Sequence, residues 1–357
     1  MTAKKFTLLI VTSFLFFIAY HFTVWQLYTS QIFKPKEGTS VGDLGRMSYQ
    51  ISMLNNRKLE YTLIKKHLNK TNYKNQPIDI LTIGDSFSNG DALGENPYYQ
   101  DFLATKFNLN ILNISKSKTY NSLETIIGLY NNGTLTKLHP KSIIIESIER
   151  LVLDRYAKDL DFSITDVNET IAPLQTKIPT IDIDFINTAN YKIPYYSFLY
   201  LFKQHAQKYV YKFSLNKNLF SINGGKKILI FRDDLRCINK STKKNIQKIN
   251  NNFNKLAVLL QNLNIKLYFM PVVDKYDLYY PYIKSNKHPN NDFFNLIRPL
   301  EKKYTLIDTK KILSPLLENN VKDLYWVDDT HWTQKASKEI SKNIKLNLIR
   351  YNITKVQ

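Results

Sequence analysis

Residues 78–90 read IDILTIGDSFSNG, an apolar run followed at once by Gly-Asp-Ser and by further small polar residues. A short apolar run rich in isoleucine is typical of a buried strand. The Gly-Asp-Ser that follows indicates a sharp turn, which is either an ordinary surface turn or one that raises the Ser86 hydroxyl as a nucleophile. The choice depends on whether the rest of the chain supplies a base and an acid.

Two further apolar runs follow at similar spacing, LNILNIS at 109–115 and KSIIIESIE at 141–149. Between the three runs lie helical patterns at 96–107 and 120–133. Continuous apolar strands that alternate with helices are typical of a parallel sheet covered on both faces. We therefore predict an α/β fold, a parallel sheet flanked by helices.

The pattern breaks at about residue 151, and the aromatic-rich residues from there to about 225 are interpreted as a partly helical insertion. The alternation resumes with strand-like runs at 226–235 and 265–274, separated by a helical pattern at 245–263. A last short strand at 304–310 precedes the closing helix. We expect these elements to continue the same sheet.

The chain begins with an almost unbroken apolar run from Phe6 to about Tyr28, preceded by Lys4 and Lys5. About 20 apolar residues span a bilayer, and basic residues before the span favour an N-terminus on the cytoplasmic side. A cleaved signal peptide would have a shorter apolar core and a small-x-small cleavage site. We predict an uncleaved signal-anchor over residues 1–29.

The rest of the chain is predicted to lie outside the cytoplasm, either periplasmic or extracellular. Residues 30–76 are interpreted as a stalk or packing helix, because 54–70 have a helical period. Residues 77–350 form the predicted catalytic domain, which includes the insertion at about 151–225.

The composition narrows the classes of partner. The 357 residues carry a formal net charge of +20, with 43% hydrophobic residues and a single cysteine, Cys237. One cysteine excludes an intrachain disulfide and a cysteine-built metal site. A basic surface suits anionic lipid head groups or acidic glycans. We predict no nucleic-acid partner, because the lysines are scattered and form no basic-aromatic recognition motif.

A base and two acids stand near the other end of the chain. The segment VDDTHWT places Asp328 and Asp329 three and two residues before His331. A serine hydroxyl becomes a nucleophile when an imidazole takes its proton, and a carboxylate holds the imidazole in the required tautomer. Residues just past strand ends meet at one edge of a doubly wound sheet. We therefore predict a triad of Ser86, His331 and one of the two aspartates.

IGDSFSNG together with DDTHW resembles the SGNH (GDSL-type) hydrolase superfamily. YWVDDTHWT, IIIESIER and MPVVDKYDLY are similar to segments of its alginate O-acetyltransferase-like branch, and the resemblance covers about residues 77–345. It implies a flavodoxin-like sheet, Ser86 as nucleophile and His331 as base. The superfamily spacing points to Asp328 as the acid and the Asp-Thr-His-Trp form points to Asp329. We favour Asp328 for its longer reach.

The sequence departs from this family where an oxyanion hole is expected. NISKSKTYNS has no glycine after the second strand, and ESIERL replaces Gly-x-Asn-Asp after the third. We therefore name Ser115, Asn121 and Arg150 as candidate oxyanion residues beside the Ser86 N–H. Arg232, at another strand end, is a candidate for binding sugar hydroxyls. No metal site or cofactor is predicted, because the other histidines have no paired spacing.

The resemblance implies an acyltransferase that carries an acetyl group as an ester on Ser86 and passes it to a polysaccharide hydroxyl. It also implies a multi-spanning membrane partner as the acyl donor. Two alternatives remain open. The same triad could act as a carbohydrate or lipid esterase with water as the acceptor, or the chain could be a non-catalytic glycan-binding protein on a degenerate SGNH fold.

Overall fold

The central sheet consists of the predicted apolar runs. In the computed structural model, β1 (Ile80–Ile83) pairs in parallel with β2 (Ile111–Ser115) on one side and with β3 (Ser142–Ile148) on the other. β8 (Lys266–Val272) and β9 (Thr305–Leu306) continue the parallel pairing beyond β3. The five parallel strands run β2-β1-β3-β8-β9. This is the flavodoxin-like order of doubly wound α/β folds.

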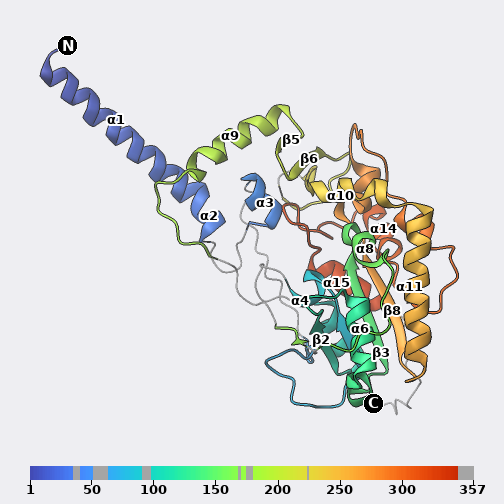
Figure 1. Ribbon diagram of the computed structural model, residues 1–357. Coiled ribbons are helices and arrows are strands. Elements are labelled where there is room, and N and C mark those ends of the chain that lie inside the picture. The colour runs from blue at the N-terminus through green and yellow to red at the C-terminus, as the bar shows by residue number, and fades with distance from the viewer. Residues whose placement is uncertain are drawn as a thin grey trace, which may run out of the picture.

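The structure describes most of the chain. The described residues are 1–34, 41–50, 63–90, 98–167, 170–173, 180–222 and 225–344. Figure 1 shows a body built around the sheet and a long N-terminal helix that projects away from it.

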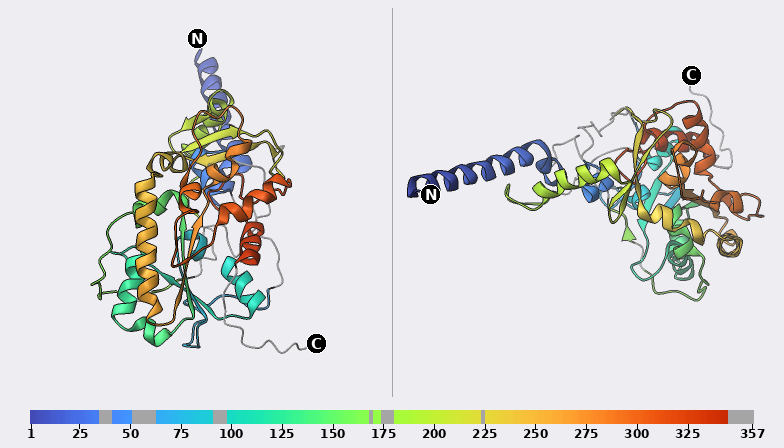
Figure 2. Two further views of the ribbon diagram at one scale, coloured as in Figure 1. Left: turned by 90° about the vertical axis from the view of Figure 1, so that its right-hand side faces the viewer. Right: turned by 90° about the horizontal axis from the view of Figure 1, so that it is seen from above.

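Helices cover both faces of the sheet, as predicted (Figures 1 and 2). α11 packs with α6 and α8, whereas α15 packs with α5 and with α14. The predicted helices at 96–107, 120–133 and 245–263 are confirmed as α5, α6 and α11. α6 is shorter than predicted at both ends, and α11 both begins and ends two residues earlier than predicted. The bounds are α5 Tyr99–Phe107, α6 Ser122–Asn131, α7 Thr134–Leu138, α8 Glu149–Tyr156, α11 Lys243–Gln261, α12 Lys275–Tyr279, α13 Phe293–Ile297, α14 Thr309–Glu318 and α15 Gln334–Asn343.

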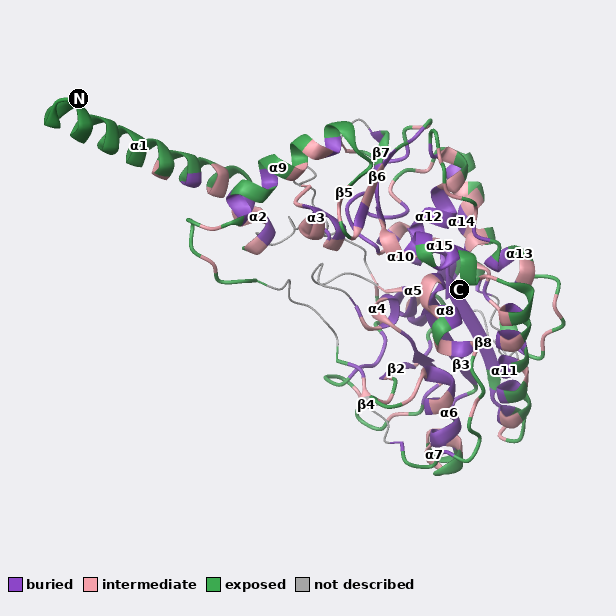
Figure 3. Ribbon diagram, turned by 45° about the horizontal axis from the view of Figure 1, so that its top comes forward, coloured by how far each residue is buried: buried purple, intermediate pink, exposed green. Residues whose placement is uncertain are grey.

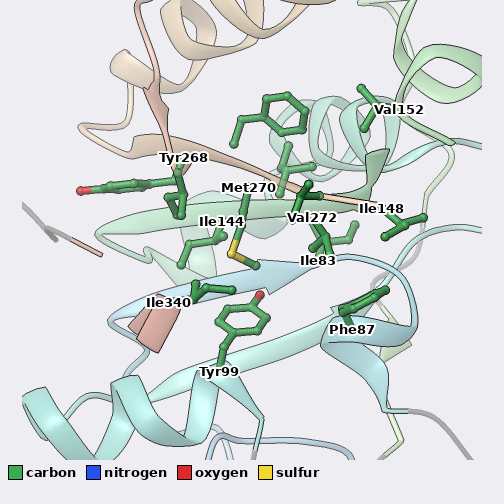
Figure 4. Packing of buried hydrophobic residues seen from close by; sticks show 14 of the residues in the cluster. Ile83, Phe87, Tyr99, Ile144, Ile148, Val152, Tyr268, Met270, Val272 and Ile340 are labelled. Atoms are coloured by element: carbon green, nitrogen blue, oxygen red, sulfur yellow. The ribbon is translucent and has the colours of Figure 1, made fainter. Parts of the chain in front are cut away.

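The core lies between the sheet and these helices (Figure 4). Ile83, Ile144 and Met270 project from three adjacent strands and are fully buried, and Tyr99 and Ile340 meet them from α5 and α15. Each such side chain contributes about 1.5–3 kcal/mol relative to exposure. β3 is buried at every position because helices cover both of its faces. Polar residues on β3 are therefore buried as well, which matters for the site.

The run at 226–235 does not join the parallel sheet, so this part of the prediction is wrong. β7 (Lys227–Phe231) pairs antiparallel with β6 (Val210–Ser214), which pairs antiparallel with β5 (His205–Gln207). The reason is a partner inside the insertion: β6 supplies a matching strand from Val210 to Ser214. β7 then leads into the short helix α10 (Arg232–Arg236). The predicted insertion thus contributes two strands of a separate three-stranded sheet.

Part of the predicted helix at 54–70 lies outside the described residues, and its described part, 63–70, is not helical. Leu68 instead forms a parallel bridge with Leu112 of β2. Its N–H donates to the Ile111 carbonyl at 2.6 Å, and its carbonyl accepts from the Asn113 N–H at 3.0 Å. These bonds pair the outer side of β2, which β4 (Thr170–Ile171) pairs further along in antiparallel register.

One N-terminal helix is long and apolar enough to cross a membrane. It comprises α1 (Ala3–Val24), a π-helical segment (Trp25–Thr29) and α2 (Ser30–Phe33), and its mean hydropathy reaches 1.9. Figure 3 shows α1 exposed along nearly its whole length. A helix of this kind is either a signal anchor or a signal sequence. Tyr20 of α1 and the π-helical segment contact α9 (Ala189–Phe202), and the short helix α3 (Asp43–Ser48) follows α2 in the chain.

Candidate active site

Ser86 opens the short helix α4 (Ser86–Asn89) directly after β1. Asp85 caps this helix by accepting the Phe87 N–H at 3.3 Å. Asn113 of β2 donates to the Ser88 carbonyl at 2.9 Å and to Asn89 Oδ1 at 3.0 Å. The turn is therefore fixed by the neighbouring strand as well as by its own cap.

A buried carboxyl group on β3, that of Glu146, holds the same turn. Glu146 Oε2 accepts the Asp85 N–H at 3.0 Å and the Ser88 hydroxyl at 2.8 Å. A Cβ at Gly84 would lie 2.2 Å from Glu146 Oε2, so the close approach requires glycine at this position. Arg155 donates to Asp85 Oδ2 at 2.7 Å. Hydrogen bonds to Glu146 and the ion pair between Asp85 and Arg155 therefore support the strand-to-helix turn.

The two carboxyl groups beneath the turn have opposite pKa shifts. Burial raises the pKa of Glu146 well above its ordinary value, and the neighbouring Asp85 carboxylate raises it further. Burial also acts on Asp85, but the Arg155 guanidinium and the hydrogen bonds to this carboxylate outweigh it and lower its pKa. Glu146 is therefore held neutral and Asp85 ionised, with Arg155 as its counter-ion.

His331 lies against Ser86. The distance from His331 Nε2 to Ser86 Oγ is 2.6 Å, and the distance from His331 Nδ1 to Asp329 Oδ1 is 2.7 Å. The Asp329 side chain is 2% exposed, and that of His331 is 14% exposed. The chain thus brings together a hydroxyl, an imidazole and a buried carboxylate in the order that nucleophilic catalysis requires.

Asp329, rather than the favoured Asp328, contacts the histidine. Asp328 Oδ2 accepts the Gly42 N–H at 3.0 Å. The reach argument was wrong because the loop folds tightly: the His331 N–H also donates to Asp329 Oδ1, at 2.9 Å, and places the ring over the nearer carboxylate.

Residues 42–45, which we call the N-terminal clasp, hold both aspartates. The Asp43 N–H donates to Asp329 Oδ2 at 3.0 Å, and the Gly45 N–H donates to the Asp328 carbonyl at 2.9 Å. In return the Asp43 carboxylate accepts the Thr330 N–H at 2.8 Å and the Thr330 hydroxyl. A segment that follows the apolar helix therefore orients the acid of the candidate triad.

Lys275 holds the histidine loop from the other side. Its ammonium group donates to the carbonyls of Trp326, Val327 and Asp329 at 2.6, 2.9 and 3.0 Å. Lys275 is 1% exposed, and burial lowers its pKa to about 8 against the opposing effect of Asp328, Asp329 and other carboxylates. A buried cation thus fixes the backbone of the loop.

The clasp adds a second carboxyl group close to Asp329. Burial raises the pKa of Asp43, and the Asp329 carboxylate raises it further, while His331 and the bonds from Thr330 oppose the shift. Ligand-type atoms of Asp43, Asp329 and His331 lie within 4.8 Å of one another, the only such group among the described residues. Hydrogen bonds among Asp43, Asp329, Thr330, His331 and Ser86 already use these atoms, so the cluster is explained without an ion.

Two of the predicted oxyanion residues have structural partners. Ser115 ends β2 and pairs with Thr170 of β4. The side-chain oxygen of Asn121 caps α6 by accepting the N–H groups of Leu123 and Glu124 at 2.9 and 3.1 Å. Asn121 is a helix cap in this structure, which accounts for its position before a helix.

The two predicted arginines lie in different places. Arg150, predicted as a candidate oxyanion residue, donates instead to Asp274 at 2.9 Å and to Asp234 at 3.2 Å. These carboxylates raise the pKa of Arg150 against the effect of burial. Arg232 borders a separate cavity of about 520 Å³. The cavity is also lined by His205, Lys208, Tyr211, Arg236 and His288.

Several residues of the site were not predicted from the sequence. Gly42, Asp43 and Asn113 have no motif around them, and Lys275 lies in MPVVDKYDLY without having been singled out; each reaches the site through the fold. The available signal was weak: Lys275 follows a predicted strand end, where site residues gather in such sheets. Gly42 and Asp43 lie in the predicted stalk and gave no signal.

Comparison of the chain with protein-family models and with curated proteins finds no match, so the assignment of function depends on the sequence motifs and on the geometry described above.

Proposed function

We propose that this chain is a membrane-anchored serine acyltransferase of the SGNH type, which acetylates hydroxyl groups of a cell-surface or exported polysaccharide. The observation that carries the proposal is the line of hydrogen bonds from Ser86 through His331 to Asp329, 2.6 and 2.7 Å long. The N-terminal helix supports the membrane part, with Lys4 and Lys5 favouring a catalytic domain outside the cytoplasm.

The proposed reaction has two halves. Ser86 Oγ attacks the carbonyl carbon of the acyl donor while His331 Nε2 takes the hydroxyl proton, and the leaving group departs with that proton. The acceptor hydroxyl then gives its proton to His331 and attacks the acyl-serine ester. The ester bond to Ser86 breaks, and the proton returns from His331 to Oγ. Asp329 stabilises the imidazolium in both halves.

The negative charge on the carbonyl oxygen requires hydrogen-bond donors. Ser86 is the first residue of α4, and the first N–H groups of a helix have no partner within the helix. The Ser86 N–H is therefore the donor that we assign, whereas Asn121 and Arg150 bond elsewhere. A donor on the outer side of the membrane must supply the acyl group, and we propose a multi-spanning membrane partner for this role.

An esterase that uses water as acceptor is the second candidate. Ser86 and His331 are both partly exposed, so water reaches the reacting atoms. The two hydrogen bonds that join Ser86, His331 and Asp329 weaken the third reading, a glycan-binding protein without catalysis, because binding alone does not require them.

The test uses the full chain in detergent or lipid, supplied with a chromogenic acetyl ester and candidate surface oligosaccharides. Acetate release and glycan mass are followed together for the wild type, Ser86→Ala and a control, Ser214→Ala, at an exposed serine of β6. Acetyl groups gained by the glycan and lost only with Ser86→Ala support the transferase. Serine-dependent acetate release without glycan gain favours the esterase, and equal behaviour of all three proteins contradicts both.

A further inference from the structure

Exposed large hydrophobic side chains are concentrated on one segment outside the N-terminal helix. Twelve such side chains are described after Tyr28, and eight of them lie between residues 181 and 202. Most are in α9. Soluble monomers seldom expose a contiguous apolar patch larger than a few hundred Å², and larger patches mark protein or membrane contacts.

The apolar residues of α9 form a stripe. Tyr191, Tyr195, Phe198 and Phe202 are 49, 58, 60 and 73% exposed. Their spacing of four, three and four residues places them on one face of the helix. We call these four residues the aromatic stripe.

The opposite face of α9 already has its partners. Tyr200 donates its hydroxyl to the Val210 carbonyl at 2.7 Å, and Ile193 packs with Ile32 and Val41. The aromatic stripe is thus the outer face of a helix whose inner face fixes it to the body. Packing on the body of the protein accounts for the inner face only.

The stripe begins beside the apolar helix α1. The Tyr20 hydroxyl donates to the Asn190 carbonyl at 2.9 Å, and His21 Nε2 lies 2.8 Å from the Tyr191 hydroxyl. The rings of Tyr20 and Tyr191 stack at 5.4 Å. Figures 1 and 3 show α9 starting at the body end of the N-terminal helix. The exposed apolar surface of α1 therefore continues onto α9.

We propose that α9 lies in the interfacial layer of the same lipid bilayer that α1 enters, with the aromatic stripe toward the acyl chains. Tyrosine and phenylalanine on one face of a surface helix are typical of this location. Lys192 and Lys203, on or next to α9, and the net charge of +20 suit the anionic head groups around it. The inference goes beyond the proposed chemistry and depends only on α1 being in a membrane.

The experiment locates four positions relative to the lipid. The full chain, in a Cys237→Ala background, is reconstituted into phosphatidylcholine–phosphatidylglycerol vesicles with an environment-sensitive fluorophore on one introduced cysteine. Phe198→Cys and Phe202→Cys test the stripe, and Phe14→Cys in α1 is the positive control. Val258→Cys in α11, which is 42% exposed, is the matched water-exposed control. Quenching by a nitroxide on the lipid chains is compared with quenching by aqueous iodide.

We expect the labels at 198 and 202 to be quenched by the lipid nitroxide as Phe14→Cys is, and to be several-fold less accessible to iodide than Val258→Cys. Labels that behave like Val258→Cys would overturn the proposal. So would labels shielded from both quenchers, because a protein surface rather than lipid would then cover the stripe. If the lipid nitroxide does not quench the label at Phe14→Cys, then α1 is not in the bilayer, and both the membrane anchor and the inference about α9 are overturned. No activity is measured, so the result is independent of the acyl-transfer proposal.

Discussion

The turn that carries Ser86 and the loop that carries His331 are stabilised in different ways. The Ser86 turn is fixed by its own cap and by strands next to it in the sheet, with Glu146 and Arg155 beneath it. The His331 loop is fixed by a buried cation and by the N-terminal clasp, which is 286 residues away in the sequence. The position of the proposed nucleophile, Ser86, is thus set by the sheet, whereas the positions of the proposed base and acid depend on a segment outside it.

The largest expected loss of activity distinguishes Asp329 from Asp328 as the acid of the proposed triad. Asp329→Asn should lower kcat for a chromogenic acetyl ester by about 10⁴-fold, because the imidazole loses the carboxylate that fixes its tautomer. Asp328→Asn is the matched control and should cost far less, since Asp328 contacts the clasp instead of His331. Equal losses in the two variants would contradict the assignment.

Lys275 tests whether the histidine loop needs its buried cation. Lys275→Met leaves three loop carbonyls without their donor, and we expect a loss of about 3 kcal/mol in the free energy of unfolding. We also expect a fall of about 10²-fold in kcat, the size expected for a misplaced base. Chemical denaturation and ester kinetics measure the two effects. Unchanged kinetics would show that the loop holds its shape without Lys275.

The lowered pKa of Lys275 predicts that the free energy of unfolding depends on pH. The pKa of Lys275 is about 8 in the fold, below its ordinary value of 10.5. Between these two values the unfolded chain binds more protons, so the contribution of Lys275 to the free energy of unfolding rises with pH. The stability difference between wild type and Lys275→Met should therefore widen above pH 8. Denaturation at pH 7, 8 and 9 measures it, and a difference that narrows would contradict the low pKa.

The clasp is tested at Gly42. A Cβ there would lie 2.2 Å from the Asp328 carbonyl oxygen, so Gly42→Ala must displace the clasp from the loop. We expect a loss of about 10-fold in kcat, because Asp329 keeps its bond to His331 but loses its support. The melting temperature should change little, since the clasp packs outside the main core. Full activity in Gly42→Ala would show that the clasp does not contribute to catalysis.

Substitution of Glu146 gives the smallest expected effect, and it tests the support of the Ser86 turn rather than that of the His331 loop. Since burial keeps Glu146 neutral, Glu146→Gln preserves its shape and its hydrogen bonding to Asp85 and Ser88, and kcat should change by less than about threefold. The raised pKa makes the contribution of Glu146 to the free energy of unfolding fall as pH rises above 4.5, and this fall should disappear in Glu146→Gln. A large loss of activity would mean that an ionised Glu146 is required.

Much of the fold could be predicted from local pattern. The apolar runs around Ile83, Ile114 and Ile145 are buried on both faces, so their sequences show the unbroken apolar character of parallel strands. The run in β7 has the same appearance, yet it pairs antiparallel with β6. Nothing in an apolar run specifies its partner, because the choice depends on which strand the insertion places beside it.

The same limit applies to the site. Ser86 and His331 stand in short motifs and could be found from the sequence, and the structure brings them into contact. The choice between Asp328 and Asp329 depends on the course of the loop, which is set by Asp43 and Lys275 from distant parts of the chain. Residue spacing contains no information about such supports, so they became visible only in three dimensions.

The short connection between the apolar helix and the clasp limits how far the candidate active site can lie from the membrane. Eight residues lie between Phe33, at the end of α2, and Gly42, so the two are nine steps apart along the chain. An extended chain covers at most about 3.5 Å per step, or roughly 30 Å in all. With the helix in the bilayer as proposed, the reactive serine works within a shallow zone above the lipid. A glycan chain would then be acetylated while it passes this zone, and polymer that has already moved away from the cell surface would escape modification.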